Sequence, residues 1–394
     1  MLNRFDVKAF KSLDDVSIDL GLVNVFVGAN GSGKSNLLEA LGILGAAASG
    51  RVDDEGLLRR GVRPGLPALY KSSFSGSRIR DAIRFSASSE KAQYSIELNN
   101  PTKSPTWSYK TERLISQKQK IVGRARASRE YASLDPHAGL AALEGARLTP
   151  QDPASRLLSD LRNYAIYTPN TPTLRGIVTD PQTREPVGLH GGRLPEAVSL
   201  LRHLAKRDDY YESVEEDLLE LIDWASDFGE RRSGQVPLAS SIPTQQRLLY
   251  FRDRYMASKR NELSGYDASE GALYVLFAAV IATLPNVPSL LAVDNVDAGL
   301  NPRLVRALIT RLCDWVLSGS STRQLLLTSH NPLILDGLPL QDDRVRLFAV
   351  DRNNRGKTVV QRVVVDDRLL AEAKKGMPLS RLWLAGYFGG VPNV

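Results

Sequence analysis

Alternating hydrophobic and polar residues near the start of the chain predict two half-exposed antiparallel strands, over Arg4–Phe10 and Val16–Leu20. Val23–Val27 is a short, mostly apolar run that predicts a buried strand ending at Gly28. Apolar residues then recur at helical spacing over Leu37–Leu44. The chain therefore opens with strands that lead through a short loop into a helix.

The pattern changes after about residue 70. Short strands separated by Asn-Pro and Ser-Pro turns are predicted at Ile83–Ser86, Tyr94–Leu98, Trp107–Lys110 and Arg113–Ser116. Helices are predicted at 154–164, at 195–206 and, as an acidic amphipathic helix, at Ser213–Phe228. This middle part reads as a β-meander followed by a helical region.

The last third returns to alternating helices and strands. Its predicted elements are buried strands at Leu290–Val293, Gln324–Thr328 and Val345–Val350, and helices at Ala272–Leu284 and Pro302–Leu317. We therefore predict an α/β domain made of residues 1–70 and 241–394, interrupted by the inserted region 71–240.

Composition changes this picture little. The 394 residues are 42% hydrophobic and 24% charged, the usual balance of a globular protein. The net charge of +7 permits a nucleic-acid partner without requiring one. The single cysteine, Cys313, excludes an intrachain disulfide and a multi-cysteine metal site. No signal core or run of ~20 apolar residues is present, so we expect a cytoplasmic protein without a membrane partner.

The strongest chemical signal is the run Gly28–Ser35, G-A-N-G-S-G-K-S, which fits the phosphate-loop pattern G-x-x-x-x-G-K-S between a strand and a helix. Such a loop closes backbone N–H groups around phosphate oxygens at a helix N-terminus. Lys34 would neutralise the β- and γ-phosphates, and the Ser35 hydroxyl would ligate Mg²⁺. The predicted cofactors are ATP and Mg²⁺, and the predicted binding residues are Gly28, Asn30, Gly31, Gly33, Lys34, Ser35 and Asn36.

Two polar residues end predicted strands of the last third. Asp294 follows the apolar strand Leu290–Val293 and suits a Mg²⁺ ligand opposite Ser35, although an isolated aspartate there is more often part of a turn. His330 follows the next strand, and neighbouring parallel strands deliver their ends to the same edge. His330 could therefore sense the γ-phosphate, although a lone histidine is usually a packing or capping residue.

The segment Ala268–Gly271 lies directly before the long apolar helix. A serine and a glycine at a helix N-terminus can hold an anion, while an N-cap is the ordinary role of such a serine. The upstream Leu263–Gly265 is a rival, but no predicted helix follows it directly. We therefore assign Ser269 and Gly271 as nucleotide contacts.

In this order the four motifs resemble the head of ATP-binding cassette (ABC) ATPases, closest to the OLD-like ATPases and their RecF-like and SMC relatives. Val293–Pro302 resembles the Walker B and D-loop of that group, Thr328–Pro332 its switch, and Leu379–Gly390 its C-terminal end. The resemblance covers residues 1–60 and 265–390 and the middle only loosely. It implies a mixed α/β sheet, an antiparallel β subdomain and an inserted helical region.

The resemblance also implies that two heads dimerise with ATP between them. The phosphate loop, Asp294 and His330 of one copy would face Ser269 and Gly271 of the other. ATP would then hold the two copies together reversibly, because most of its contacts to the second copy form only in the closed dimer. We expect a homodimer or a higher homo-oligomer.

The chain departs from the family pattern in two places. Asn295 stands where the family has the glutamate that activates the attacking water, and general-base catalysis is worth roughly 10²–10⁴-fold. Hydrolysis should be slow or depend on Asp297 or a carboxylate of a partner; alternatively, Asn295 positions the water, as a glutamine does in GTPases. The predicted catalytic residues are Asp294, Asn295 and His330.

The second departure is that nothing after residue 345 resembles the Toprim domain of OLD nucleases, so we expect an ATPase without an attached nuclease.

Three functions fit the sequence. The first is the sensor or scaffold subunit of a bacterial anti-phage defence system, which controls a separate effector, a nuclease or toxin. The second is a RecF-like DNA-repair clamp, and the third is a non-hydrolysing module locked by ATP. We assign no Q-loop glutamine.

A basic stretch could contact DNA phosphates, although such runs are usually solvated loops. Its residues are Lys118, Lys120, Arg124, Arg126 and Arg129, with Tyr131 nearby.

Overall fold

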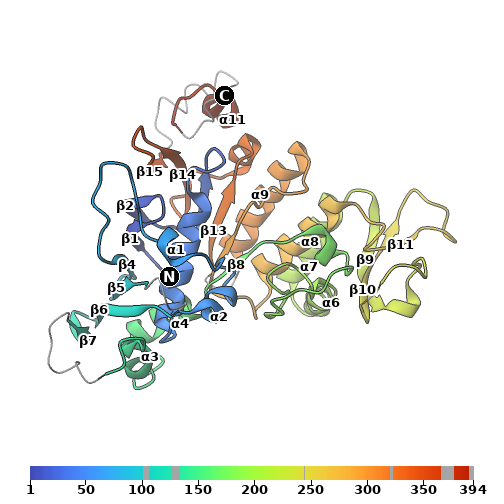
Figure 1. Cartoon of the computed structure of the whole chain (residues 1–394). Coiled ribbons are helices and arrows are strands. Elements are labelled where there is room, and N and C mark those ends of the chain that lie inside the picture. The colour runs from blue at the N-terminus through green and yellow to red at the C-terminus, as the bar shows by residue number, and fades with distance from the viewer. Residues whose placement is uncertain (101–105, 126–133, 244, 320–322, 365–376, 390–394) are drawn as a thin grey trace.

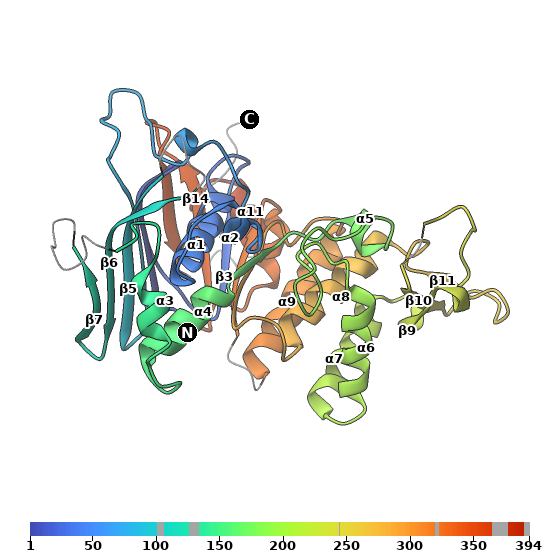
Figure 2. The same ribbon diagram turned by 60° about the horizontal axis from the view of Figure 1, so that its bottom comes forward.

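A computed structural model describes residues 1–100, 106–125, 134–243, 245–319, 323–364 and 377–389. Three sheets and the helices between them follow one another along an elongated molecule (Figure 1). Figure 2 shows the sequence of layers: the antiparallel sheet, α1 and α4, the central sheet, α8 and α9, and finally α6 and α7 with a small outer sheet.

The central sheet has six strands in the order β15-β14-β3-β13-β12-β8. Their bounds are β3 (Val23–Val27), β8 (Ala165–Tyr167), β12 (Leu290–Val293), β13 (Gln324–Ser329), β14 (Val345–Arg352) and β15 (Thr358–Val363). All neighbours are parallel except β14 and β15, so the predicted mixed sheet is confirmed. Every residue of β3, β12 and β13 is buried, as expected of a parallel sheet covered on both faces.

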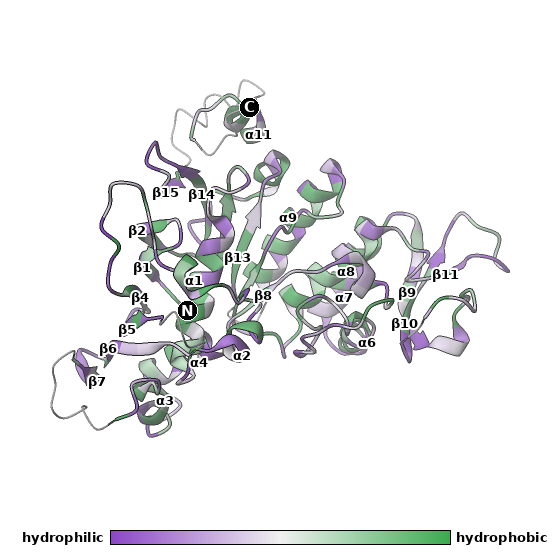
Figure 3. Cartoon of the chain, viewed as in Figure 1, coloured by the Kyte–Doolittle hydropathy of each residue, from purple (hydrophilic) through white to green (hydrophobic). Residues whose placement is uncertain are grey.

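The central sheet separates two hydrophobic cores, because successive side chains of a strand point to opposite faces. Val25 and Val27 pack in the core with α8 (Glu270–Thr283) and α9 (Pro302–Ser318). Phe26 packs in the other core with α1 (Lys34–Ala48) and α4 (Pro153–Asn163). Helix α8 is apolar around its whole circumference, and Figure 3 shows it green within the molecule.

The second sheet is antiparallel, with six strands in the order β2-β1-β4-β5-β6-β7. Their bounds are β1 (Arg4–Phe10), β2 (Leu13–Asp19), β4 (Ile83–Ser88), β5 (Ala92–Asn99), β6 (Ser108–Ser116) and β7 (Gln119–Arg124). Strand β6 corrects the prediction of two separate strands. The pairing of β5 with β6 shifts register at Lys110, where one extra residue interrupts the alternation. The interruption is a bulge within one strand, and a bulge gives the same sequence pattern as a break.

The remaining helices are short or belong to the middle of the chain. They are α2 (Asp54–Leu58), α3 (Leu140–Gly145), α5 (Thr171–Leu174), α6 (Leu194–Ala205), α7 (Asp209–Leu221) and α11 (Leu379–Leu384), with 3₁₀ turns at Pro67–Leu69, Ser233–Gln235 and Pro332–Gly337. Within the described part of the chain, no helix combines the length and apolar character that crossing a bilayer requires.

The third sheet contains β9 (Ala225–Arg232), β10 (Arg247–Asp253) and β11 (Glu262–Ser264). Strand β9 corrects the prediction of one helix over Ser213–Phe228, because α7 already ends at Leu221. Phe228 is opposite Phe251 of β10 in the antiparallel ladder. The pairing with a strand some twenty residues later decides the conformation of this segment, and helical periodicity alone could not reveal it.

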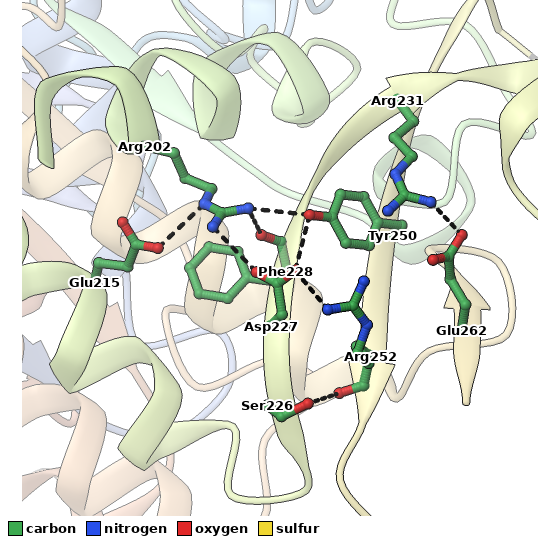
Figure 4. A network of polar contacts seen from close by, with 9 residues as sticks. All are labelled: Arg202, Glu215, Ser226, Asp227, Phe228, Arg231, Tyr250, Arg252 and Glu262. Carbon is green, nitrogen blue, oxygen red and sulfur yellow. Dashed lines mark hydrogen bonds and ion pairs between the residues drawn. The ribbon is translucent and has the colours of Figure 1, made fainter. Parts of the chain in front are cut away.

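Arg202 of α6 joins this sheet to the helices (Figure 4). Its guanidinium lies 3.1 Å from Glu215 Oε1 of α7 and 3.1 Å from Asp227 Oδ1 of β9, and it donates to the Tyr250 hydroxyl. Arg231 lies 4.1 Å from the centroid of the Tyr250 ring. One side chain thus joins three elements and adds polar contacts to the apolar packing of Phe228, Leu249 and Phe251 in the core that they share with α6, α7 and α8.

The middle of the chain contributes to all three sheets. Residues 83–124 extend the sheet that β1 and β2 begin, and β8 completes the edge of the central sheet. The division at residues 70 and 240 stays a prediction, and the nucleotide-binding part of the fold includes β8 in any case.

Candidate nucleotide-binding site

The loop Gly28–Gly33 joins the end of β3 to the start of α1. Gly33 has φ +113°, and a Cβ at this position would lie 2.2 Å from Thr358 Oγ1. A Cβ at Gly28 would lie 2.1 Å from the carbonyl oxygen of Val350. Both glycines are therefore required, Gly28 by a neighbouring backbone carbonyl and Gly33 by its φ and the Thr358 side chain. Asn30 and Gly31 are exposed at the tip of the loop, where backbone N–H groups are accessible to a phosphate.

Lys34 begins α1 and lies almost buried beneath the loop. Its Nζ donates to the carbonyl oxygens of Gly28 at 2.8 Å and Ala29 at 3.0 Å. Burial lowers the pKa of Lys34, while the nearby carboxylates of Asp294 and Asp297 oppose this shift. The ammonium is held in place by neutral acceptors, which phosphate oxygens would replace with stronger, charge-assisted hydrogen bonds.

Ser35 and Asp294 meet although they come from distant parts of the chain. Ser35 Oγ lies 3.2 Å from Asp294 Oδ1 and 2.9 Å from Oδ2. The Thr328 hydroxyl also donates to Asp294 Oδ1, and the Asn295 N–H donates to Thr328 Oγ1 at 2.8 Å. These contacts fix the carboxylate at the ends of β12 and β13. A hydroxyl beside a carboxylate is a hard oxygen donor set that suits Mg²⁺.

Asn295 has φ +55°, in the left-handed region that Asn tolerates better than most residues. His330 is half-exposed, and its Nε2 lies 4.0 Å from Asp297 Oδ2. The Asp297 side chain is buried, and its Oδ1 has no hydrogen-bond partner in the described part of the chain. His330 and Asp297 thus lie close together beyond the ends of β13 and β12, with one Asp297 carboxylate oxygen left for a further donor.

Ser269 and Gly271 lie elsewhere on the chain. Ser269 is the N-cap of α8 and accepts the Ala272 N–H at 3.4 Å. Both residues line a hollow of about 650 Å³ between α8, α9 and the segment after α7. Gly299 and Asn301 line the same hollow. The cavity beside Ser35 and Asp294 shares no lining residue with it.

Other predicted residues have structural partners. Asn36 Nδ2 donates to Ser12 Oγ at 2.8 Å, which ties α1 to the turn between β1 and β2. Arg124 of the basic stretch is buried and donates to the Ala138 carbonyl at 2.8 Å. Arg126, Arg129, Tyr131 and Gly390 lie outside the described residues.

Three further residues lie at this site, and their part in it was not predicted from the sequence. Thr328 bridges Asp294 and Asn295, and it was visible only as part of the switch motif. His190 lines the cavity of about 470 Å³ that also contains Ser35 and Asp294. Asp180 contacts His190 through Oδ1 at 3.0 Å. Neither Asp180 nor His190 lies in a motif, so only their position in the fold identifies them.

Comparison with known proteins gives a family and a fold. The family model described as "AAA domain, putative AbiEii toxin, Type IV TA system" matches residues 23–172 and 180–336. The DNA replication and repair protein RecF of Renibacterium salmoninarum is 45% identical over 69 residues, 16% of this chain and 17% of that protein. RecF of Rhodococcus erythropolis is 42% identical over 80 residues, 20% of this chain and 18% of that protein. The chain thus matches less than a fifth of the length of these curated relatives.

Among solved structures, the SMC head bound to the C-winged helix domain of ScpA has a TM-score of 0.50 at 11% identity and covers 94% of this chain and 99% of its own. The SMC head domain from Thermotoga maritima has a TM-score of 0.45 at 14% identity and covers 92% and 99%. The family match shows that the chain belongs to this AAA domain family, and the phosphate loop and the Ser35–Asp294 contact lie in an ABC-type ATPase fold like that of the SMC head.

Proposed function

We propose that two copies of this chain close on two ATP·Mg²⁺ and that closure controls a separately encoded effector, a nuclease or toxin, in bacterial anti-phage defence. The observation that carries dimerisation is the separation of the two halves of the site. Ser269 and Gly271 line a hollow that shares no residue with the cavity beside Ser35 and Asp294. A second copy would supply them to a nucleotide held at Lys34.

Within each site, the chain's own residues have distinct tasks. The loop N–H groups and Lys34 bind the phosphates. Ser35 and Asp294 would hold Mg²⁺, which supplies charge neutralisation at the β- and γ-phosphates when bound. Thr328 keeps the Asp294 carboxylate in position. Because Asn295 offers an amide where the family has a carboxylate, we propose that hydrolysis is slow and that the closed state persists.

The defence role rests on the description of the family as a toxin of a toxin–antitoxin system and on the resemblance to OLD-like ATPases. A separate effector is also consistent with the SMC head structure that contains a ScpA domain, in which a head binds a second protein.

Mass measurement in solution with and without ATP·Mg²⁺ tests dimerisation. We expect the wild type to double its mass with the nucleotide and the Lys34→Ala variant to stay monomeric.

Gly271→Asp is the sharper variant. At the second position of α8 an aspartate is favourable for the helix, yet it would face the phosphates of the opposite nucleotide.

We expect Gly271→Asp to bind ATP with unchanged affinity and to lose ATP-dependent dimerisation by at least about tenfold, the effect of ~1.4 kcal/mol. Ser213→Asp, with the same charge change at an exposed site on α7, is the matched control and should dimerise normally. A Gly271→Asp variant that dimerises like the wild type would contradict the proposed arrangement.

A RecF-like DNA clamp is the second candidate, favoured by the local identity to two RecF proteins. It predicts ATP-dependent binding of duplex DNA that weakens steeply with salt. Arg124 is unsuitable as a probe because its burial makes it structural. Lys120 is exposed, and Lys120→Glu should weaken DNA binding without loss of stability if this candidate is correct. A third candidate, a module locked by ATP, predicts binding and dimerisation with no phosphate release.

A further inference from the structure

A cavity of about 470 Å³ opens beside Ser35 and Asp294, on the side of the central sheet where β8 forms the edge. Thr168, Gln182 and His190 form part of its wall. None of these residues belongs to a motif that predicts a function. The cavity lies next to the hydroxyl and carboxylate that suit Mg²⁺, so groups in its wall lie near the place where the phosphates would bind.

Backbone hydrogen bonds connect His190 to Asp294 across β8. The Asp294 N–H donates to the Tyr167 carbonyl at 3.0 Å, and the Thr168 N–H donates to the Leu189 carbonyl at 2.9 Å. Residues 189 and 190 therefore lie beside β8, on the side away from β12. With neighbouring strands about 4.8 Å apart, the backbones of His190 and Asp294 are roughly 10 Å apart, a gap that an imidazole and one water can bridge.

The His190 ring is oriented by a buried carboxylate. Asp180 Oδ1 lies 3.0 Å from His190 Nδ1, and the Asp180 side chain is 2% exposed. Asp180 also accepts the backbone N–H groups of Gln182, His190 and Gly192. Burial by itself would raise the pKa of Asp180, but these four hydrogen bonds outweigh it and lower the pKa. Asp180 is therefore an ionised acceptor at neutral pH.

An ionised carboxylate at Nδ1 assigns the ring proton to Nδ1, so that neutral His190 carries its lone pair on Nε2. In the described part of the chain, no hydrogen-bond partner of Nε2 is found, and the side chain is 28% exposed. A carboxylate that binds one nitrogen of a histidine and leaves the other nitrogen free is the arrangement that proton-accepting histidines use.

The loop is shaped around the Asp180 carboxylate. Gly188 has φ +79°, and a Cβ there would lie 2.2 Å from Asp180 Oδ2. A Cβ at Gly192 would lie 2.5 Å from Asp180 Cβ. No side chain larger than hydrogen fits at either position, so the close approach of the loop to Asp180 needs both glycines.

We propose that His190, oriented by Asp180, accepts the proton of the water that attacks the γ-phosphate, the task for which Asn295 has no suitable lone pair. The water oxygen forms a bond to the γ-phosphorus as its proton moves to Nε2, and the bond from this phosphorus to the β–γ bridging oxygen breaks, with its electron pair leaving on ADP. The proton later passes from Nε2 to solvent through the open cavity. The proposal rests on ATP hydrolysis as part of the proposed function.

The test compares two variants of His190 with a matched control. His190→Asn keeps an N–H that can reach Asp180 and removes the Nε2 lone pair, whereas His190→Ala removes both. His203→Ala changes an exposed histidine of α6. We expect both His190 variants to bind ATP within about threefold of the wild type and to lose about 10²-fold in kcat, a typical contribution of proton transfer. Free imidazole should restore part of the activity of His190→Ala, and His203→Ala should behave as the wild type.

A second readout does not depend on turnover. The chain has four histidines, so ¹⁵N resonances of the His190 ring can be assigned by comparison with His190→Asn. We expect a proton on Nδ1 in the free protein and a shift of the Nε2 resonance when Mg²⁺ and a non-hydrolysable ATP analogue bind. The proposal would be overturned by a proton on Nε2 in the free protein, or by an Nε2 resonance that does not shift when the nucleotide binds.

The two proposals fail in different ways. If the wild type hydrolyses ATP and His190→Asn keeps more than half of kcat, the role of His190 is wrong and the proposed function stands. If the wild type binds ATP and releases no phosphate, the hydrolytic part of the proposed function is wrong, and the Nε2 resonance alone decides whether His190 meets the nucleotide. Loss of ATP binding together with a lower Tm in both variants would show that the dyad only holds the loop.

Discussion

Ser35 Oγ lies 2.9 Å from Asp294 Oδ2, although 259 positions of the chain separate the two residues. Thr328 contacts the same carboxylate from the neighbouring strand. The hydroxyl and the carboxylate are thus held together by the fold before any cation is present. A Mg²⁺ between them would replace one hydrogen bond with two oxygen–metal bonds and therefore needs little rearrangement.

This contact predicts a specific effect of Asp294→Asn. The amide can keep hydrogen bonds to Ser35 and Thr328, but it removes the negative charge that Mg²⁺ requires. We expect ATP affinity in EDTA to change by less than about threefold and the affinity with Mg²⁺ to fall at least about tenfold, measured by calorimetry. Asp209→Asn, at an exposed position, removes the same charge and should leave both affinities unchanged. Equal losses with and without Mg²⁺ would contradict the assignment of Asp294 as a metal ligand.

Asn295→Glu tests why this position carries an amide. A glutamate could accept the proton of an attacking water, so we expect kcat for ATP to rise by about 10-fold or more. The φ of +55° favours Asn over Glu, so the same variant should lose roughly 1 kcal/mol of stability. Asn295→Gly separates the two effects, because glycine accepts this φ and offers no base. If Asn295→Gly gained as much activity as Asn295→Glu, the backbone and not the carboxylate would control the rate.

Glu112 predicts a pH dependence of stability. Burial raises its pKa and outweighs the hydrogen bonds from the Ala141 and Leu140 N–H groups and the Tyr94 hydroxyl. Since the folded pKa lies above the unfolded one, this residue's contribution to stability is present in full below the unfolded pKa and is lost as the pH rises through the folded pKa. Glu112→Gln does not titrate and escapes this loss.

We therefore expect the Tm of Glu112→Gln, relative to the wild type, to increase between about pH 4 and pH 7. Glu90→Gln at an exposed site should show no such trend. Glu112→Ala should lose about 1–3 kcal/mol at the acid end of this range, where Glu112 contributes most, because it leaves buried N–H groups without an acceptor. A constant Tm difference for Glu112→Gln across this range would show that Glu112 does not couple folding to pH.

Cys313 predicts how the native protein reacts with thiol reagents. It is fully buried in α9, and burial raises its pKa to about 12. The thiolate is the reactive form, so we expect no labelling by an aromatic disulfide reagent over minutes at pH 8 in the folded state. Labelling should be complete within minutes in denaturant. Because the chain has a single cysteine, fast labelling of the native protein could only mean that α9 opens readily.

Local patterns predicted most of the central sheet. The buried runs at Val23–Val27 and Leu290–Val293 became β3 and β12 with the predicted bounds, because side-chain alternation and burial are properties of consecutive residues. The two errors have one cause. The bulge at Lys110 and the strand that contains Phe228 both depend on a partner strand, and no local pattern encodes a partner.

The sequence by itself determined the phosphate loop. Its glycines, Lys34 and Ser35 lie within eight consecutive residues, so their spacing along the chain already places them close together in space. Only the tertiary structure decided that Thr328 holds Asp294, and that Asp180 contacts a His190 that lines the same cavity as Asp294. These contacts exist because segments from opposite ends and from the middle of the chain end at one edge of one sheet, and packing of the two cores, not sequence spacing, places them there.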